Sequence, residues 1–149
     1  MRSVEASTFI DATPERVWAL YTDIARTPEW VPFVEDVVSV SGPLAVGMTY
    51  RERTRIGRIH GVQEWRIDEL EPPRRRVETS ESLRMHSRLT ITMEREGSGT
   101  QLRQVSEVRS TLPRPLGWLQ ESFVGLVARR AMRAAVLGAK RTLENVRSP

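Results

Sequence analysis

The change of pattern after Pro113 and Pro115 is the feature that most restricts how this chain can fold. Before it, segments that alternate apolar and polar residues follow one another at hairpin-length spacing, which is typical of antiparallel β-strands. After it, residues 116–145 are rich in Ala, Leu and Arg, with apolar residues at helical spacing, which predicts one long helix. An antiparallel sheet with one apolar face needs a cover, and this helix is the only element able to supply it. The sequence therefore predicts an α+β fold.

Seven segments are predicted to be strands. The clearest is 48–56, where Met48, Tyr50, Glu52, Thr54 and Ile56 share one face. Turns are predicted at Gly57, at Pro72-Pro73 and at Gly97-Ser98-Gly99. The predicted strands are residues 3–10, 34–40, 48–56, 59–70, 75–81, 83–95 and 100–111. The helix face expected to cover them carries Leu116, Leu119, Phe123, Leu126, Val127, Ala134 and Leu137.

Two short helices are predicted between the first and second strands. Thr13-Pro14-Glu15 and Thr27-Pro28-Glu29 each combine an N-capping threonine, a proline suited to the first helical position and a glutamate that favours the helix N-terminus. The second helix must be very short, because Pro32 follows and a β-rich run begins at Val34. The plain explanation is a pair of connectors.

The composition is that of an ordinary soluble protein, with 149 residues, 39% hydrophobic and 28% charged, which fits one domain over 1–149. No apolar run is long enough for a membrane span, and the N-terminus lacks the apolar centre of a secretory signal. We therefore expect a cytoplasmic protein. The absence of cysteine excludes disulfides, thiolate metal sites and cysteine nucleophiles.

The positive charge is concentrated at the C-terminal end. Residues 113–149 hold seven Lys and Arg against Glu121 and Glu144. A solvated helix face explains this charge; an acidic or membrane-surface contact through Arg129, Arg130 and Arg133 is the alternative. No nucleic-acid-binding motif is present, so no nucleic-acid partner is expected.

These segments resemble the START and Bet v 1-like (SRPBCC) superfamily, especially its polyketide cyclase/dehydrase-like branch. The resemblance rests on "ATPERVWALYTDIARTPEWVPFVEDVVSV" (12–40), "GPLAVGMTYRER" (42–53), "DELEPPRRRVETS" (68–80) and "GSGTQLRQVSE" (97–107). It implies a helix-grip fold, in which a curved six- to seven-stranded antiparallel sheet wraps around the long C-terminal helix. It also implies a cavity that binds a lipid, quinone or polyketide-like molecule, with the short helices at its entrance. Trp30 and Phe33 would then line or gate that entrance, or simply pack.

Alternation along the strands also predicts which side chains face the interior. Five of them are polar, namely Glu52, Gln63, Ser87, Gln104 and Ser106. A filled core rarely tolerates so many, because each unpaired buried group costs about 1–3 kcal/mol, whereas a cavity holding water or ligand does. The alternative is that bulges shift the strand register, or that these groups bond one another. The predicted ligand-binding residues are Trp30, Phe33, Tyr50, Glu52, Gln63, Trp65, Met85, Ser87, Gln104, Ser106 and Phe123.

Glu52 is the most specific candidate for a functional residue, since burial on an apolar face would raise the pKa of its carboxyl and suit it to general acid/base catalysis. The alternative is an ion pair with an arginine such as Arg58 or Arg84. His60 and His86 are predicted on outer faces, which argues against a hydrolytic triad. We expect neither a metal site nor a cofactor.

The sequence leaves three classes of function open. The first is a carrier or sensor for a small, mostly apolar ligand. The second is a cyclase or dehydratase acting on a polyketide-like substrate, with Glu52 as general acid/base and Tyr50 assisting. The third is an interaction module that uses the basic helix face.

Overall fold

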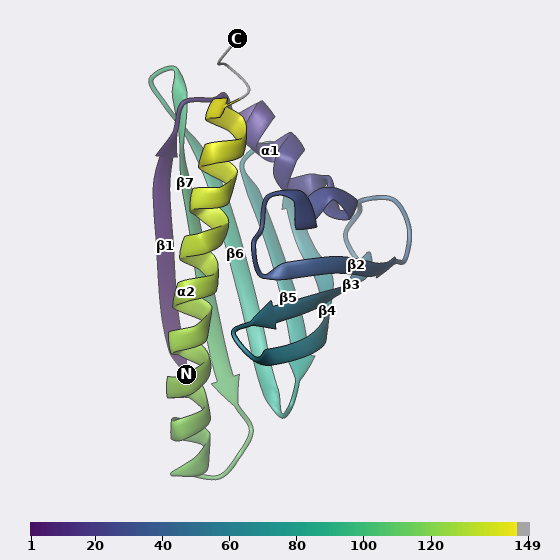
Figure 1. The fold of residues 1–149 in the computed structure, drawn as a ribbon, viewed down its shortest axis with the longest axis vertical. Coiled ribbons are helices and arrows are strands. Elements are labelled where there is room, and N and C mark those ends of the chain that lie inside the picture. The colour runs from purple at the N-terminus through teal and green to yellow at the C-terminus, as the bar shows by residue number, and fades with distance from the viewer. Residues whose placement is uncertain (146–149) are drawn as a thin grey trace.

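Seven antiparallel strands form one curved sheet in the order β1-β7-β6-β5-β4-β3-β2 (Figure 1). The computed structural model describes residues 1–145. The strands are β1 (Arg2–Ile10), β2 (Val34–Val40), β3 (Thr49–Ile56), β4 (Ile59–Glu71), β5 (Arg75–Ser82), β6 (Met85–Glu96) and β7 (Gly99–Ser110). Strands β2 to β7 are sequential neighbours, and the N-terminal strand completes the sheet by pairing with β7. The predicted helix-grip architecture is confirmed.

The turn between β5 and β6 falls where the sequence predicted strand. Leu83 and Arg84 have φ of 51° and 61°, in the left-handed region that closes a two-residue hairpin. The strand predicted from residue 83 therefore begins at Met85, and Leu83 is an exposed turn residue.

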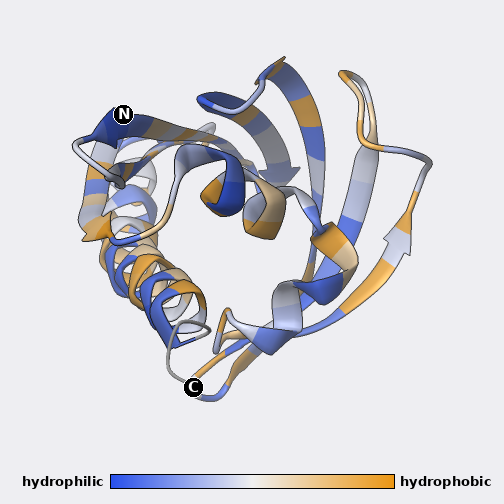
Figure 2. Cartoon of the chain, turned by 90° about the horizontal axis from the view of Figure 1, so that it is seen from above, coloured by the Kyte–Doolittle hydropathy of each residue, from blue (hydrophilic) through white to orange (hydrophobic). Residues whose placement is uncertain are grey.

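Helix α2 (Leu116–Asn145) runs along the concave side of the sheet and packs against β1 and β7. Figure 2 shows the sheet curving around this helix and the short helices. Near its start, the Glu121 carboxylate accepts a hydrogen bond from the Ser110 backbone N–H at 3.0 Å and lies 3.3 Å from the amino group of Met1. Farther along, Gly138 allows the backbone of α2 to lie close to the backbone at Trp30, since a Cβ at position 138 would lie 2.1 Å from the Trp30 carbonyl oxygen.

The face of α2 that packs on the sheet is not the one expected. Its buried residues are mostly small or of moderate size, namely Gly117, Glu121, Gly125, Met132, Ala135, Val136, Gly138, Ala139 and Leu143. The predicted covering residues Leu116, Leu119, Phe123, Leu126 and Leu137 are exposed instead. Small side chains allow the helix to approach the strands closely, so the helix presents them to the sheet and turns its larger apolar residues outwards.

Two short helices follow β1, as predicted, but only the first begins as expected. Helix α1 (Pro14–Thr22) is capped by Thr13, whose hydroxyl accepts a hydrogen bond from the Arg16 N–H at 3.3 Å. The second is a 3-10 helix, η1 (Ile24–Glu29), so the second Thr-Pro-Glu ends this helix rather than starting it. The Thr27 hydroxyl donates to the Ile24 carbonyl at 2.7 Å instead of capping.

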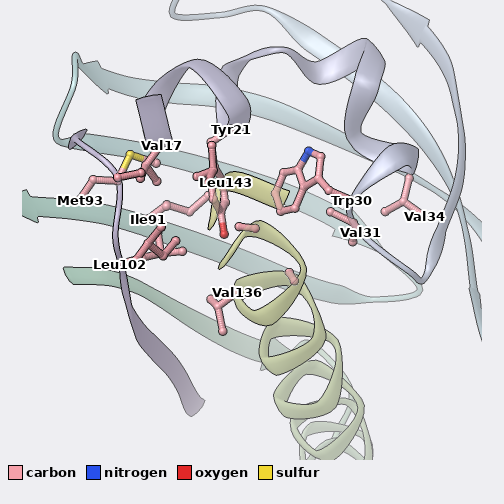
Figure 3. Close-up of a cluster of buried hydrophobic side chains, with 14 residues drawn as sticks. Val17, Tyr21, Trp30, Val31, Val34, Ile91, Met93, Leu102, Val136 and Leu143 are labelled. Atoms are coloured by element: carbon pink, nitrogen blue, oxygen red, sulfur yellow. The ribbon is translucent and has the colours of Figure 1, made fainter. Parts of the chain in front are cut away.

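The solid part of the core lies at one end of the space between sheet and helix. Figure 3 shows α1 and the C-terminal half of α2 contributing Val17, Val136 and Leu143 to a cluster with Ile91 and Leu102. A second cluster joins Ile24 to Met48, Tyr50, Trp65 and Ile67. The middle of α2, over residues 124–135, faces a cavity instead.

Candidate ligand-binding site

A cavity of about 210 Å³, partly open to solvent, lies between the sheet, η1 and the middle of α2. Its α2 wall is apolar, with Val124, Val127, Ala128, Ala131 and Met132, because small side chains leave space beneath the helix. Nine of the residues predicted to bind ligand line this cavity: Trp30, Phe33, Tyr50, Glu52, Gln63, Trp65, Ser87, Gln104 and Ser106. For the seven of these residues that lie on strands, alternation identified the cavity face.

Met85 and Phe123, also predicted, lie outside the cavity wall. Phe123 is 56% exposed, because the face of α2 that carries it points away from the sheet. Met85 is buried, but it is the first residue of β6 and pairs with Ser82 and Ser110 at the end of both neighbouring strands.

A buried charged cluster forms the polar part of the wall. The Tyr50 hydroxyl donates to Glu78 Oε2 at 2.8 Å, and Arg76 Nη2 donates to Glu78 Oε1 at 3.2 Å. Arg76 Nη1 also donates to the Tyr21 carbonyl. Burial, together with the negative charge of Glu78, raises the pKa of Tyr50 well above its ordinary value, so its hydroxyl stays protonated. The cluster is a fixed, internally paired polar surface.

Glu52 lies beside this cluster with its own partner. The indole N–H of Trp65 donates to Glu52 Oε1 at 3.2 Å. Burial first, and then the charge of Glu78, raise the pKa of Glu52 from its ordinary value of 4.5 to about 7, against the lowering effects of Trp65 and Arg76. The predicted rise is confirmed. The suggested ion pair with Arg58 or Arg84 is wrong, because both arginines lie in exposed turns.

Two buried donors on cavity-lining residues have no hydrogen-bond partner among the described residues, namely Trp30 Nε1 and Arg76 Nε. Buried polar groups in folded proteins are nearly always paired with protein, water or ligand. By contrast, Gln104 is engaged, since its Nε2 donates to the Tyr21 hydroxyl at 2.7 Å. Both nitrogen atoms are inaccessible to solvent, so they are unsatisfied groups within the cavity wall.

Sequence reasoning missed Arg76 and Glu78, which lie on the predicted strand 75–81 but were not assigned to the interior. The signal that identifies them is the cross-strand pairing. Arg76 pairs with Ile91 and Glu78 with Leu89, two residues that alternation already placed inside. Strand β5 is also the central strand of the sheet, where the concave face is covered. Neither fact is readable before the strand order is known.

The histidines lie away from the cavity, as predicted. His60 Nδ1 is 3.6 Å from a Glu35 carboxylate oxygen and His86 Nδ1 is 3.0 Å from one of Glu81, all partly exposed. Over residues 1–145, no group of three or more His, Asp or Glu side chains is placed to hold a metal ion. No helix in that same range is both long and apolar enough to cross a membrane.

Comparisons with known proteins agree with this geometry. The family described as polyketide cyclase / dehydrase and lipid transport matches residues 1–144. The Zhui aromatase/cyclase from Streptomyces sp. R1128 has a similar structure, with a TM-score of 0.84 and 17% identity over 99% of this chain and 96% of that one. A START superfamily protein from Mycobacterium smegmatis superimposes with a TM-score of 0.79 and 15% identity, over 97% and 98% of the two chains.

A third similar structure, TTHA0849 from Thermus thermophilus, has a TM-score of 0.77 and 21% identity over 99% of this chain and 100% of that one. No protein of curated function is detectably similar in sequence. These structural likenesses show the fold, and the match over residues 1–144 shows the family. The chain belongs to the polyketide cyclase/dehydrase and lipid transport family.

Proposed function

We propose that this protein binds a small, mostly apolar molecule carrying a few polar groups, such as a lipid, quinone or polyketide-like compound, and acts as its carrier or sensor. The observation that carries the proposal is the cavity between sheet and α2, with an apolar helical wall facing a buried polar cluster. Such a surface suits a ligand with an apolar body and an oxygen-bearing end.

The size and polarity of the cavity narrow the class of ligand. At about 210 Å³ it is smaller than the roughly 300–1,000 Å³ typical of sites for drug-sized molecules, so a compact ligand, or one that extends through the open side, fits best. The polar part of the wall, made of Tyr50, Glu52, Arg76 and Glu78, favours a ligand that carries a few polar groups on an apolar body.

The comparisons support this class without naming the ligand. The matching family is described by both polyketide cyclisation or dehydration and lipid transport, and the similar structures include an aromatase/cyclase and a START superfamily protein. Both descriptions involve molecules that are largely apolar.

A second candidate function, a cyclase or dehydratase, rests on Glu52. A carboxyl in the cavity wall with a pKa of about 7 can both donate and accept a proton near neutral pH, as a general acid/base must. Tyr50 would assist indirectly, because its proton is committed to Glu78. Replacing Glu52 with Gln would then abolish turnover while ligand affinity survives, whereas a carrier has no turnover to lose.

The binding proposal is tested in two steps. Native mass spectrometry of the freshly purified protein, followed by denaturation, identifies any apolar molecule bound in stoichiometric amount. Isothermal titration with 2-naphthol then measures the cavity directly, because this probe combines apolar rings with one hydroxyl. We expect saturable binding of one probe molecule per chain.

Matched variants show whether the probe occupies the cavity. Ala131 lines it, whereas Ala134 lies on the same helix outside the lining, so Ala131→Phe fills the cavity and Ala134→Phe is the control. We expect Ala131→Phe to abolish probe binding and Ala134→Phe to retain it. The proposal is wrong if neither a co-purified molecule nor the probe binds the wild-type protein, or if Ala131→Phe binds as tightly as wild type.

A further inference from the structure

The solvent-facing side of α2 is strongly apolar over its first three turns. Leu116, Leu119, Phe123 and Leu126 recur at the i, i+3, i+7 and i+10 spacing of one helical face, and each is between 53% and 58% exposed. We call these four residues the apolar stripe. Trp118, also exposed, flanks it. A contiguous exposed apolar surface of this kind marks an interaction site.

A second element extends the stripe. Leu83, in the β5–β6 turn, is 86% exposed, and Gln120 Nε2 of α2 donates to its carbonyl at 2.8 Å. Its φ of 51° lies in the backbone region where a two-residue turn usually places Asn or Gly. A leucine there costs backbone energy and buries little, so folding does not explain it. Together, Leu83, Trp118 and the apolar stripe form what we call the docking face.

Positive charge continues along the same helix. Arg129, Arg130 and Arg133 are exposed, and no carboxylate lies within ion-pairing distance of them in the part of the chain that the structure describes. The two acidic residues of α2 do not oppose them, since Glu121 is buried against Ser110 and Glu144 pairs with Lys140 at 2.9 Å. The docking face is therefore apolar with an arginine-only extension.

This combination identifies the partner by its chemistry. Self-association of the stripe would bring the arginines of two copies together, and α2 has no exposed carboxylate to pair with them. An anionic lipid surface accepts both parts, because apolar and aromatic side chains enter the interface while arginines pair with headgroups.

We propose that the docking face, with Arg129, Arg130 and Arg133, binds the surface of an anionic lipid bilayer. Val124 and Val127, which line the cavity, lie next to Phe123 and Leu126 on the same turns of α2. A docked bilayer would thus lie beside the helical wall of the cavity. The proposal does not depend on which ligand the cavity holds.

The test is flotation of the full chain with vesicles of phosphatidylcholine alone or of phosphatidylcholine with phosphatidylglycerol. We expect binding to the anionic vesicles only, weakened by added salt. Leu119→Gln with Phe123→Gln should lower the partition coefficient about tenfold or more, because these side chains no longer enter the interface. Replacing Arg129, Arg130 and Arg133 with Gln should lower it on the order of 100-fold.

Two matched controls distinguish binding by the docking face from nonspecific hydrophobic or electrostatic binding by the rest of the surface. Val38→Gln with Val62→Gln removes two exposed apolar side chains from the sheet. Replacing the exposed Arg58, Arg88 and Arg109 with Gln removes the same charge elsewhere. Both controls should bind anionic vesicles within about twofold of wild type. An unchanged far-ultraviolet circular dichroism spectrum and thermal unfolding transition show that each variant is folded.

Three results would overturn the proposal. They are failure of the wild type to bind anionic vesicles, equal losses in the controls and the docking-face variants, and a wild-type dimer that ignores vesicles and dissociates on Leu119→Gln with Phe123→Gln. The last would assign the stripe to a second copy of this chain.

Discussion

Replacing Glu52 with Gln should change the pH dependence of folding stability. Burial keeps Glu52 protonated in the folded protein up to a pH of about 7, whereas in the unfolded chain the proton leaves near the ordinary pKa of 4.5. Between these values the folded state binds more protons than the unfolded state, so the free energy of unfolding falls as pH rises. The destabilisation is complete above pH 7 and absent below about pH 4.5.

The magnitude follows from the interval between the two pKa values. At about 1.4 kcal/mol per pH unit, this interval of about 2.5 units corresponds to about 3.5 kcal/mol of unfolding free energy lost by the wild type at high pH. Glutamine cannot ionise and keeps a carbonyl oxygen to accept the Trp65 N–H. The Glu52→Gln variant should therefore gain up to about 3 kcal/mol relative to wild type between pH 5 and pH 8.

Urea denaturation gives the unfolding free energy of wild type and of Glu52→Gln at pH 5 and at pH 8. The gain is the change, from pH 5 to pH 8, in the difference between the two proteins. Any effect of the amide on packing is shared by both pH values and cancels. Glu64→Gln is the control, because Glu64 is an exposed carboxylate paired with Arg51 across β3 and β4, where a surface pair contributes at most about 1 kcal/mol. An unchanged difference between wild type and Glu52→Gln at pH 5 and 8 would refute the reasoning.

The remaining predictions concern stability at fixed pH. Arg76→Met should destabilise the protein by about 3–5 kcal/mol, since it leaves the buried Glu78 carboxylate without its charged partner. Adding Glu78→Met should recover part of this loss, and denaturant titration measures the unfolding free energy of both variants. If the double variant is no more stable than Arg76→Met, the unpaired charge of Glu78 is not the cause of the loss. Gly138→Ala should cost about 1–3 kcal/mol, because the added methyl group meets the Trp30 carbonyl; an unchanged melting temperature would contradict the close approach.

Local signals in the sequence were sufficient to predict most of the elements. Period-two alternation depends only on the pleat, so it predicted the strands and placed Tyr50 and Glu52 on one inward face, where the structure has them. Thr13, Pro14 and Glu15 act within a single turn, so the start of α1 was equally readable. A carboxyl among apolar residues was enough to predict the direction in which its pKa moves.

Tertiary structure decided what local signals leave ambiguous. Periodicity identified the apolar face of α2 but not whether that face points towards the sheet. A helix with small residues on one side and leucines on the other can pack either side against the sheet. The close approach at Gly138 decides it, and Phe123 moves from the predicted cavity to the surface. Arg76 and Glu78 entered the site only through the strand order, which makes β5 central and its polar face interior. Packing of elements far apart in sequence, which no local pattern encodes, determined both.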